Sequence, residues 1–294
     1  MDMRQLRYFY TIAQEGQITR AAKRLHMAQP PLSQSLKSLE SNLGVTLLER
    51  NGRKMELTHA GQVLYDKAEF FFNYLNETIT EVKDTGIGMR GKLTVGCVKT
   101  CFSYLPERIK KFREKYPEIT FELREGDSYY LAEQLENRQL DLAVVRLPVE
   151  MKPFSGHYLP EEDNVVIMPE SWGAAFNKKS IRIEELADYP LVLLKRLHGS
   201  GPYEVIIDKF KQRKIEPNVV TICPDVGMVY KLVSTGVGAT ILPASTLAKN
   251  TVGDIQVFEM ENECIASSSA VIWLKDRYLS KSAERFIDLF KNHI

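Results

Sequence analysis

The first 44 residues repeat apolar side chains at helical spacing in three blocks, and this pattern constrains the fold more than any other feature of the chain. Gly16 is expected to end the first helix, Thr19 to cap a short second helix, and Gly44 to end the third. The inward positions are, in order, Leu6, Phe9, Tyr10 and Ala13; Ala22 and Leu25; and Leu32, Leu36, Leu39 and Leu43. A short helix, a tight connection and a longer helix form the helix-turn-helix pattern.

The third of these helices has an outer face that suits a nucleic acid. It opens with Pro30 and Pro31, which a first helical turn tolerates because the N–H groups there have no partner within the helix. In a helix-turn-helix the second helix of the pair enters the major groove, where glutamine can pair with adenine edges and lysine neutralises phosphate. The outward positions are Gln29, Pro30, Ser33, Gln34 and Lys37. A plain solvated helix face would account for them as well.

The residues that follow favour the DNA interpretation. Short strands over 45–49 and 55–58 flank Arg50-Asn51-Gly52-Arg53-Lys54, where Asn-Gly is a strong hairpin signal and the cations form a basic wing. Residues 1–58 carry a net charge of +4, whereas the rest of the chain carries −3. A basic head on a mildly acidic body suits a polyanion at one end only. The expected DNA contacts are Thr19, Arg20, Gln29, Pro30, Pro31, Ser33, Gln34, Lys37, Arg50, Arg53 and Lys54.

With these motifs the sequence resembles the LysR-type transcriptional regulators. The resemblance covers residues 6–61 almost without gaps and is carried by LRYFYTIAQEGQITRAAKRLHMAQPPLSQSLKSLESNLGVTLLERNGRKMELTHAG. It implies a sequence-specific DNA-binding transcription regulator whose activity a small-molecule effector modulates. The chain departs from the family pattern at Gln17, where serine is common, at Ala28, where a polar cap is common, and at Gln34, where arginine is frequent. The operator sequence therefore cannot be carried over from the family.

A long helix is expected after the wing, because residues 59–84 contain no proline and Thr58 can cap the start. Apolar positions spaced 4, 3, 4, 3 and 4 form a heptad seam, namely Leu64, Ala68, Phe71, Leu75, Thr78 and Val82. Such a seam suggests a partner helix in another chain, although the helix could instead pack on its own domain. The resemblance also implies pairing of the heads into a homodimer on double-stranded DNA with dyad symmetry, and assembly of dimers into a homotetramer.

Beyond residue 90 short apolar strands alternate with helices, which predicts an α/β domain. Strands over 93–97, 119–123 and 140–145, separated by helices, imply a mostly parallel sheet. A second set follows, with strands over 165–168, 191–194, 219–223 and 239–242, helices over 203–212 and 226–235, a strand over 270–274 and a closing helix over 279–290.

The predicted fold class is therefore multidomain α+β, with a winged helix-turn-helix over 1–58, a linker or dimerisation helix over 59–89 and an effector-binding domain over 90–294. Gly86, Gly88 and Gly91 loosen the chain at the last boundary. The resemblance implies two Rossmann-like lobes similar to those of periplasmic binding proteins. Lobe I would comprise 92–161 and 265–294 and lobe II 162–264, with crossings near Pro160 and Glu263.

In such a sheet, ligands bind at the carboxyl ends of strands and at helix N-termini, where N–H groups point at anions. The expected effector contacts are Thr100, Ser128, Tyr129, Arg146, Ser200, Gly201, Tyr203, Asp225 and Val226. Each has a structural alternative: Thr100, Ser128 and Asp225 as helix caps, and Arg146 as an ion pair between the lobes. One cation among hydroxyl groups and helix N-termini suggests an organic anion, such as a carboxylate.

Other functions find less support in the sequence. No nucleophile elbow, P-loop or dinucleotide fingerprint indicates an enzyme, and the scattered histidines and cysteines predict no metal site and no cofactor. Cys97 and Cys101 could form a redox pair, but small buried thiols are the simpler interpretation. A solute-binding protein would need a signal peptide, which the N-terminus lacks. Without a membrane-spanning run either, a cytoplasmic protein is expected.

Overall fold

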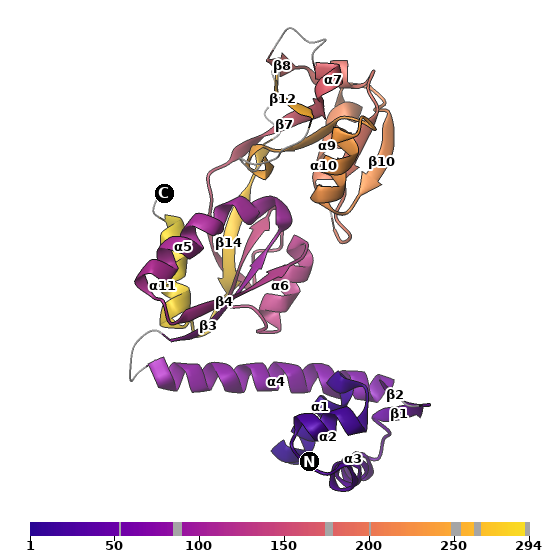
Figure 1. Cartoon of the computed structure of the whole chain (residues 1–294), viewed down its shortest axis with the longest axis vertical. Coiled ribbons are helices and arrows are strands. Elements are labelled where there is room, and N and C mark those ends of the chain that lie inside the picture. Colours follow the sequence, from indigo (N-terminus) through magenta and orange to yellow (C-terminus); the bar gives the residue numbers. More distant parts are fainter. Residues whose placement is uncertain are drawn as a thin grey trace. The chain divides into compact units, whose positions relative to one another are not determined.

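The computed structural model describes residues 1–52, 54–84, 90–173, 179–199, 201–247, 254–261 and 266–291. It divides into two compact units, Met1–Lys83 and Asp84–Ile294 (Figure 1). The expected domain limits stay predictions. Several predicted positions lie outside the described residues, namely Arg53, Gly86, Gly88, Ser200 and Glu263.

The predicted helix-turn-helix is present in the first unit. Its helices are α1 (Met3–Glu15), α2 (Ile18–Arg24) and α3 (Gln29–Leu43), and Gly16 and Gly44 end α1 and α3 in the left-handed conformation with φ of 61° and 70°. Thr19 is not the cap of α2, because Gln17 occupies that position and Thr19 lies within the first turn. Leu43 is also not inward, since it falls in the last turn of α3 and is exposed.

The wing begins later than the sequence predicted. Its strands are β1 (Leu48–Asn51) and β2 (Lys54–Leu57), which pair in antiparallel fashion. The preceding residues 45–47 are not a strand, because the Leu47 N–H donates to Glu40 Oε1 at 2.8 Å and so ties the chain to α3. Asn51 faces Lys54, and Gly52 turns the chain with φ of 60°.

Helix α4 (His59–Asp84) follows the wing and packs against α1. The Gly61 N–H donates to Thr58 Oγ1 at 2.9 Å, so Thr58 caps α4 as predicted. The rings of Tyr10 on α1 and Tyr65 on α4 stack with centroids 4.9 Å apart, and the Tyr10 hydroxyl donates to Glu69 at 3.1 Å. These contacts join α4 to the head.

Lobe I of the second unit is built on a sheet with the strand order β4-β3-β5-β14-β6. Its elements are β3 (Gly91–Cys97), η1 (Lys99–Tyr104), α5 (Pro106–Lys115), β4 (Ile119–Glu125), α6 (Ser128–Glu136), β5 (Leu142–Arg146), β6 (Phe154–Tyr158), β14 (Ser269–Leu274) and α11 (Lys281–Lys291). The run β4-β3-β5 is parallel, as predicted, but β14 and β6 join it antiparallel. The sheet is therefore mixed. The chain reaches β14 from the other lobe, without the crossover helix that usually joins parallel neighbours.

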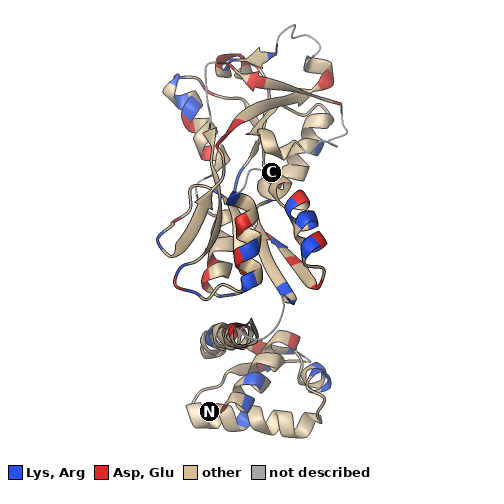
Figure 2. Ribbon diagram, turned by 90° about the vertical axis from the view of Figure 1, so that its left-hand side faces the viewer, with Lys and Arg blue, Asp and Glu red and all other residues tan. Residues whose placement is uncertain are grey.

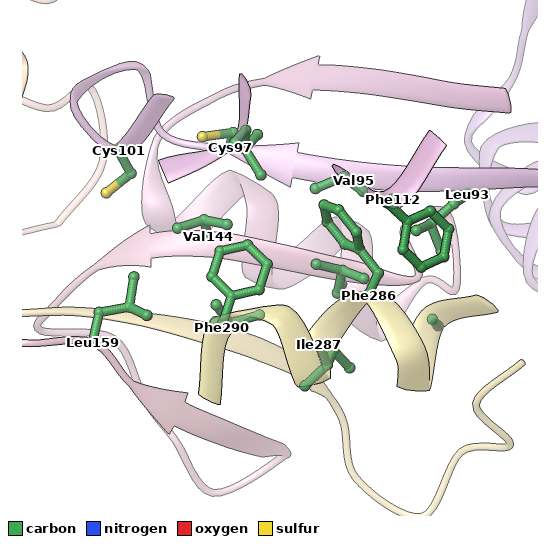
Figure 3. Close-up of a cluster of buried hydrophobic side chains, with 14 of the residues drawn as sticks. Leu93, Val95, Cys97, Cys101, Phe112, Val144, Leu159, Phe286, Ile287 and Phe290 are labelled. Carbon is green, nitrogen blue, oxygen red and sulfur yellow. The ribbon is translucent and has the colours of Figure 1, made fainter. Parts of the chain in front are cut away.

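Helices cover both faces of this sheet and bury one core on each side. Helices α5 and α11 pack on one face, where Phe112 lies edge to face with Phe286 at 5.3 Å and Phe290 joins the cluster (Figure 3). Helix α6 packs on the other face. Cys97 and Cys101 lie at one end of the first core (Figure 3).

Lobe II contains a sheet ordered β11-β7-β12-β8 and a parallel pair, β10 and β9. Its elements are β7 (Glu162–Pro169), α7 (Glu170–Gly173), β8 (Ser180–Ile181), α8 (Ile183–Leu186), β9 (Leu191–Leu194), α9 (Pro202–Gln212), β10 (Val219–Cys223), α10 (Val226–Ser234), β11 (Thr240–Pro243), η2 (Ala244–Thr246), β12 (Ile255–Met260) and β13 (Ala266–Ser267). A bridge between Leu191 and Ala239 connects the pair to the sheet. The sequence patterns did not predict β6, β8, β12 or β13.

Candidate functional site: a DNA-facing head and a cleft between two lobes

Most of the residues predicted to contact DNA are exposed on the surface of the head. Leu32, Leu36 and Leu39 turn one side of α3 into the head core and leave its other side to solvent. The exposed members of the predicted set are Thr19, Arg20, Gln29, Pro30, Pro31, Gln34, Lys37, Arg50 and Lys54, and Ser33 is half-buried. Lys and Arg recur along the helices of this unit (Figure 2).

A hollow of about 230 Å³ brings predicted contacts from three elements together. It is lined by Thr19 of α2, Gln29 of α3 and Arg50 of β1, beside Gln17, Ile18 and Met55. Glutamine and threonine side chains can hydrogen-bond to phosphate or base atoms, and arginine adds charge-assisted bonds. Residues of α2, α3 and β1 that the sequence predicts to contact DNA therefore meet in one hollow of the head.

The residues of α4 that were predicted to form the dimerisation seam lie in two different environments. Leu64 packs against the head core, Ala68 is buried within the single chain, and Leu75 lines a hollow together with residues of α1. These positions face the chain's own head, contrary to the expectation for the seam as a whole. Phe71, Thr78 and Val82 are exposed, together with the apolar side chains Val63, Phe70, Tyr74 and Ile79.

A cavity of about 300 Å³ lies in the second unit where strands of both lobes end. Val98, Lys99 and Thr100 follow β3, Gly126 and Asp127 follow β4, and Arg146 ends β5; Arg196 and Leu197 follow β9, and Asp225 and Val226 follow β10. A neighbouring cavity of about 290 Å³ shares Thr100, Arg146, Arg196 and Pro202 with the first. We call the two together the cleft.

Arg146 occupies the joint between the lobes, and each of its guanidinium nitrogens has a protein acceptor. Nη1 forms an ion pair with Glu162 Oε1 at 2.6 Å, and Nη2 donates to the Thr100 carbonyl at 2.9 Å and to Ser245 Oγ at 2.8 Å. Glu162 also accepts hydrogen bonds from the Ser245 N–H and hydroxyl. The side chains of Arg146 and Glu162 are only 3% and 14% exposed, so this is a buried ion pair. The arrangement matches the ion-pair alternative for Arg146.

A second set of contacts joins the two lobes, from the loop after β9 and from the start of α10. His198 Nδ1 lies 2.9 Å from Asp127 Oδ2 of lobe I, and Gly199 lies against the ring of Tyr129, with no room for a side chain. Lys99 of lobe I forms an ion pair with Asp225, which also caps α10 through the Met228 N–H. Lobe I and lobe II are thus joined by these contacts as well as by the Arg146–Glu162 pair.

The Lys99–Asp225 contact predicts a pH-dependent difference between variants. Lys99 lowers the pKa of the Asp225 carboxyl, so the contact stabilises the fold above the ordinary aspartate pKa and is lost as the pH falls through the lowered value. Asp225 in turn raises the pKa of Lys99, so the contact persists to beyond about pH 10. Lys99→Gln should lower the free energy of unfolding at pH 7 by up to about 1 kcal/mol, because both side chains are partly exposed.

Chemical unfolding between pH 7 and pH 3 measures this difference, which should shrink towards the acid end. The exposed Lys110→Gln serves as the matched control and should show no such trend. A difference between wild type and Lys99→Gln that is constant with pH would contradict the assignment.

The remaining predicted effector residues are distributed as follows. Thr100, Arg146, Asp225 and Val226 line the first cavity and Gly201 lines the second. Ser128 does not line either; it is fully buried, and its hydroxyl donates to the Arg146 carbonyl at 2.7 Å, which fixes α6 to β5. Tyr203 packs into the lobe II core under Lys195. Sequence reasoning missed Lys99, Asp127, Arg196 and His198, although each follows a strand end by the same rule that selected Thr100.

The two cysteines considered as a redox pair are buried as free thiols. Burial raises the pKa of Cys101 to about 11 and raises that of Cys97 further. Thiolate is therefore scarce at neutral pH, which disfavours oxidation chemistry at either position.

Among the described residues, no cluster of three histidine, cysteine, aspartate or glutamate side chains is placed to hold a metal ion. No helix in the described ranges is long and apolar enough to cross a bilayer.

Comparison with known proteins gives matches along the whole chain. A family model described as "Bacterial regulatory helix-turn-helix protein, lysR family" matches residues 3–62, and one described as "LysR substrate binding domain" matches 87–294. The HTH-type transcriptional regulator BsdA of Bacillus subtilis is 37% identical over 99% of this chain and 100% of its own length. The transcriptional dual regulator GltC of Bacillus subtilis is 33% identical over 98% and 96%.

A solved structure also resembles the fold over its whole length. The crystal structure of full-length CbnR complexed with its target DNA superposes with a TM-score of 0.80 at 26% identity, covering 99% of both chains.

Proposed function

Because this chain belongs to the LysR family of transcriptional regulators, we propose that it reads DNA with the outer face of α3 and responds to a small-molecule effector bound in the cleft. The observation that carries the proposal is that the cleft is lined by residues of both lobes. A ligand in the cleft contacts both lobes at once and stabilises whichever arrangement of the two lobes fits it best. Such a shift can be passed to the DNA-binding heads only if binding free energy differs between the arrangements.

We further propose that α4 pairs two heads. The exposed apolar side chains Val63, Phe70, Phe71, Tyr74 and Val82 lie on a helix that is otherwise attached to its own head. A continuous apolar strip on one helix is more stable when a second helix covers it. The predicted seam is accordingly revised: Phe71, Thr78 and Val82 remain in it, and Val63, Phe70 and Tyr74 replace the positions that face the head. Two heads related by a two-fold axis would read a site with dyad symmetry.

Base readout and phosphate binding are expected to respond differently to mutation. Gln29→Ala removes a candidate base contact at the exposed start of α3 and should weaken binding to a selected genomic duplex by about 10- to 100-fold, with less effect on random DNA. Lys37→Gln removes a phosphate contact and should weaken binding to both duplexes similarly, while the slope of log K against log salt falls by about one. Titrations by fluorescence anisotropy at several salt concentrations measure both quantities.

The exposed Lys110→Gln of unit 2 is the matched control for a lost lysine charge and should bind both duplexes as wild type does. Equal losses on selected and random DNA for Gln29→Ala would contradict base readout at the start of α3.

A further inference from the structure

We propose that Glu40 is a positioning residue that fixes the angle between the recognition helix α3 and the dimerisation helix α4. By fixing this angle, Glu40 sets the spacing of the two DNA half-sites that a dimer accepts. The inference rests on the proposed functions of α3 and α4. It gives a part in the selection of DNA to a carboxylate that is not among the predicted DNA contacts.

The connection between α3 and the wing is the first part of the argument. Residues 45–47, which we call the bracket, join the end of α3 to β1 beside the start of α4 (Figure 1). Glu40 of α3 accepts hydrogen bonds at Oε1 from the Leu47 N–H at 2.8 Å and from the Leu48 N–H at 3.2 Å. Leu47 and Leu48 are buried and Glu40 is half-buried. Because a buried N–H group needs an acceptor, Glu40 ties the end of the bracket to α3.

The opposite side of the bracket is tied to α4. The Leu47 carbonyl accepts a hydrogen bond from the Thr58 N–H at 3.0 Å, and the Thr58 hydroxyl donates to the Thr46 carbonyl at 2.8 Å. The Thr58 hydroxyl oxygen also accepts from the Gly61 N–H in the first turn of α4. Leu47 therefore contacts α3 through its N–H group and the cap of α4 through its carbonyl oxygen.

These hydrogen bonds differ in kind from the apolar contacts between the two helices. Leu39 of α3 belongs to the head core, against which Ala60 and Leu64 of α4 pack. The hydrophobic effect is non-directional, whereas a hydrogen bond weakens steeply when its angle is distorted. We infer that the apolar core holds α3 and α4 together and that the bracket sets the angle between them. Glu40 is the side chain that joins α3 to the bracket.

The angle matters because two paired heads must fit the same duplex. Moving one half-site by one base pair shifts it by about 3.4 Å along the DNA axis and rotates it by about 35° around that axis. If α4 pairs the heads, the position of each α3 in its groove follows from the angle between α3 and α4. A fixed angle then selects one spacing, whereas a variable angle accepts several spacings through the same base contacts.

Selection of binding sites from a library of random-sequence duplexes tests the inference with the full-length protein. The quantity measured is the distribution of distances between the two half-sites of the enriched motif, and we expect one dominant spacing for the wild type. Glu40→Leu removes the acceptor of two N–H groups. It should lower the preference for the dominant spacing over its neighbours at least about fivefold, since one hydrogen bond shifts an equilibrium by about three- to tenfold.

Glu40→Gln is the matched control, because the amide keeps an acceptor oxygen and loses the charge; it should retain the wild-type spacing. Ser41→Leu introduces the same leucine at the adjacent, exposed position and should also retain the spacing. Thr58→Val removes the hydroxyl on the α4 side of the bracket and should broaden the spacing as Glu40→Leu does, so that the test survives if Glu40→Leu does not fold. A general loss of stability would reduce the DNA recovered at every spacing and leave the preference unchanged.

The inference is overturned if folded Glu40→Leu, or folded Thr58→Val in its place, keeps the spacing preference within about twofold of the wild type. Equal broadening by Glu40→Gln or Ser41→Leu would overturn it as well. A wild type that enriches no paired motif contradicts the proposed function, and the assignment of Glu40 falls with it. A wild type that enriches a paired motif whose spacing is unchanged in the variants retains its proposed function and loses only the assignment of Glu40.

Discussion

Glu162→Gln is expected to lower the free energy of unfolding of the second unit by about 3 kcal/mol, because it leaves Arg146 buried without its counter-ion. The two carboxylate oxygens of Glu162 accept hydrogen bonds from the Ser245 N–H and from its hydroxyl, and glutamine replaces one of these oxygens with an NH₂ group, so that one donor would face another. For a unit of this size the melting temperature should fall by roughly 6 to 12 °C. Differential scanning calorimetry of the full chain measures the change.

Glu161→Gln is the matched control, since it removes one carboxylate from the adjacent, exposed position, where Glu161 accepts a hydrogen bond from the Ser268 hydroxyl at 2.9 Å. Glu161→Gln should change the free energy of unfolding by no more than about 0.5 kcal/mol. The double variant Arg146→Met with Glu162→Leu should recover part of the loss, because an apolar pair needs no desolvation of charge. If Glu162→Gln melts within 2 °C of the wild type, the joint between the lobes does not depend on this ion pair.

Gly61→Ala should destabilise the head by about 2 kcal/mol, although alanine in a helix is normally favoured over glycine by about 1 kcal/mol. A Cβ atom at position 61 would lie 1.9 Å from the carbonyl oxygen of Leu47, which is backbone and cannot rotate away. That carbonyl also accepts a hydrogen bond from the Thr58 N–H at 3.0 Å. The start of α4 would have to move away from the segment that precedes β1, and the affinity for DNA should fall together with the stability.

Gln62→Ala, one residue further along α4 at an exposed position, is the control and should change stability by less than about 0.5 kcal/mol. Thermal unfolding followed by circular dichroism, combined with DNA titration, compares the two variants. A Gly61→Ala protein as stable as Gln62→Ala would mean that α4 does not approach the Leu47 backbone as closely as described.

The parts of this fold that could be predicted from the sequence are those set by local periodicity. The spacing of Leu32, Leu36 and Leu39 gave α3, and the left-handed glycines Gly16 and Gly44 gave the ends of α1 and α3. The rule that ligands bind where strands end also placed Thr100 and Arg146 at the cleft. These inferences need only neighbours in the sequence or a general property of sheets.

The parts that could not be predicted depend on contacts between distant residues. Nothing near Arg146 in the sequence shows that Glu162 would neutralise it or that Ser245 would accept its hydrogen bond, and residues 127 and 198 meet only after both lobes have folded. Heptad spacing alone could not show that Ala68 faces its own head, because one helix presents several apolar faces. Arg196 was overlooked because the glycines and hydroxyl groups of the same loop match more closely the pattern expected for an anion site at a helix N-terminus.

The most direct test of the account is selection from genomic DNA. Purified full-length protein is mixed with sheared DNA of its source organism at moderate salt, and the retained fragments are sequenced. We expect enrichment of a few promoter regions that share a dyad-symmetric motif, and we expect Gln29→Ala protein to lose this enrichment. Uniform retention of all fragments by folded protein at every salt concentration would contradict sequence-specific reading by α3.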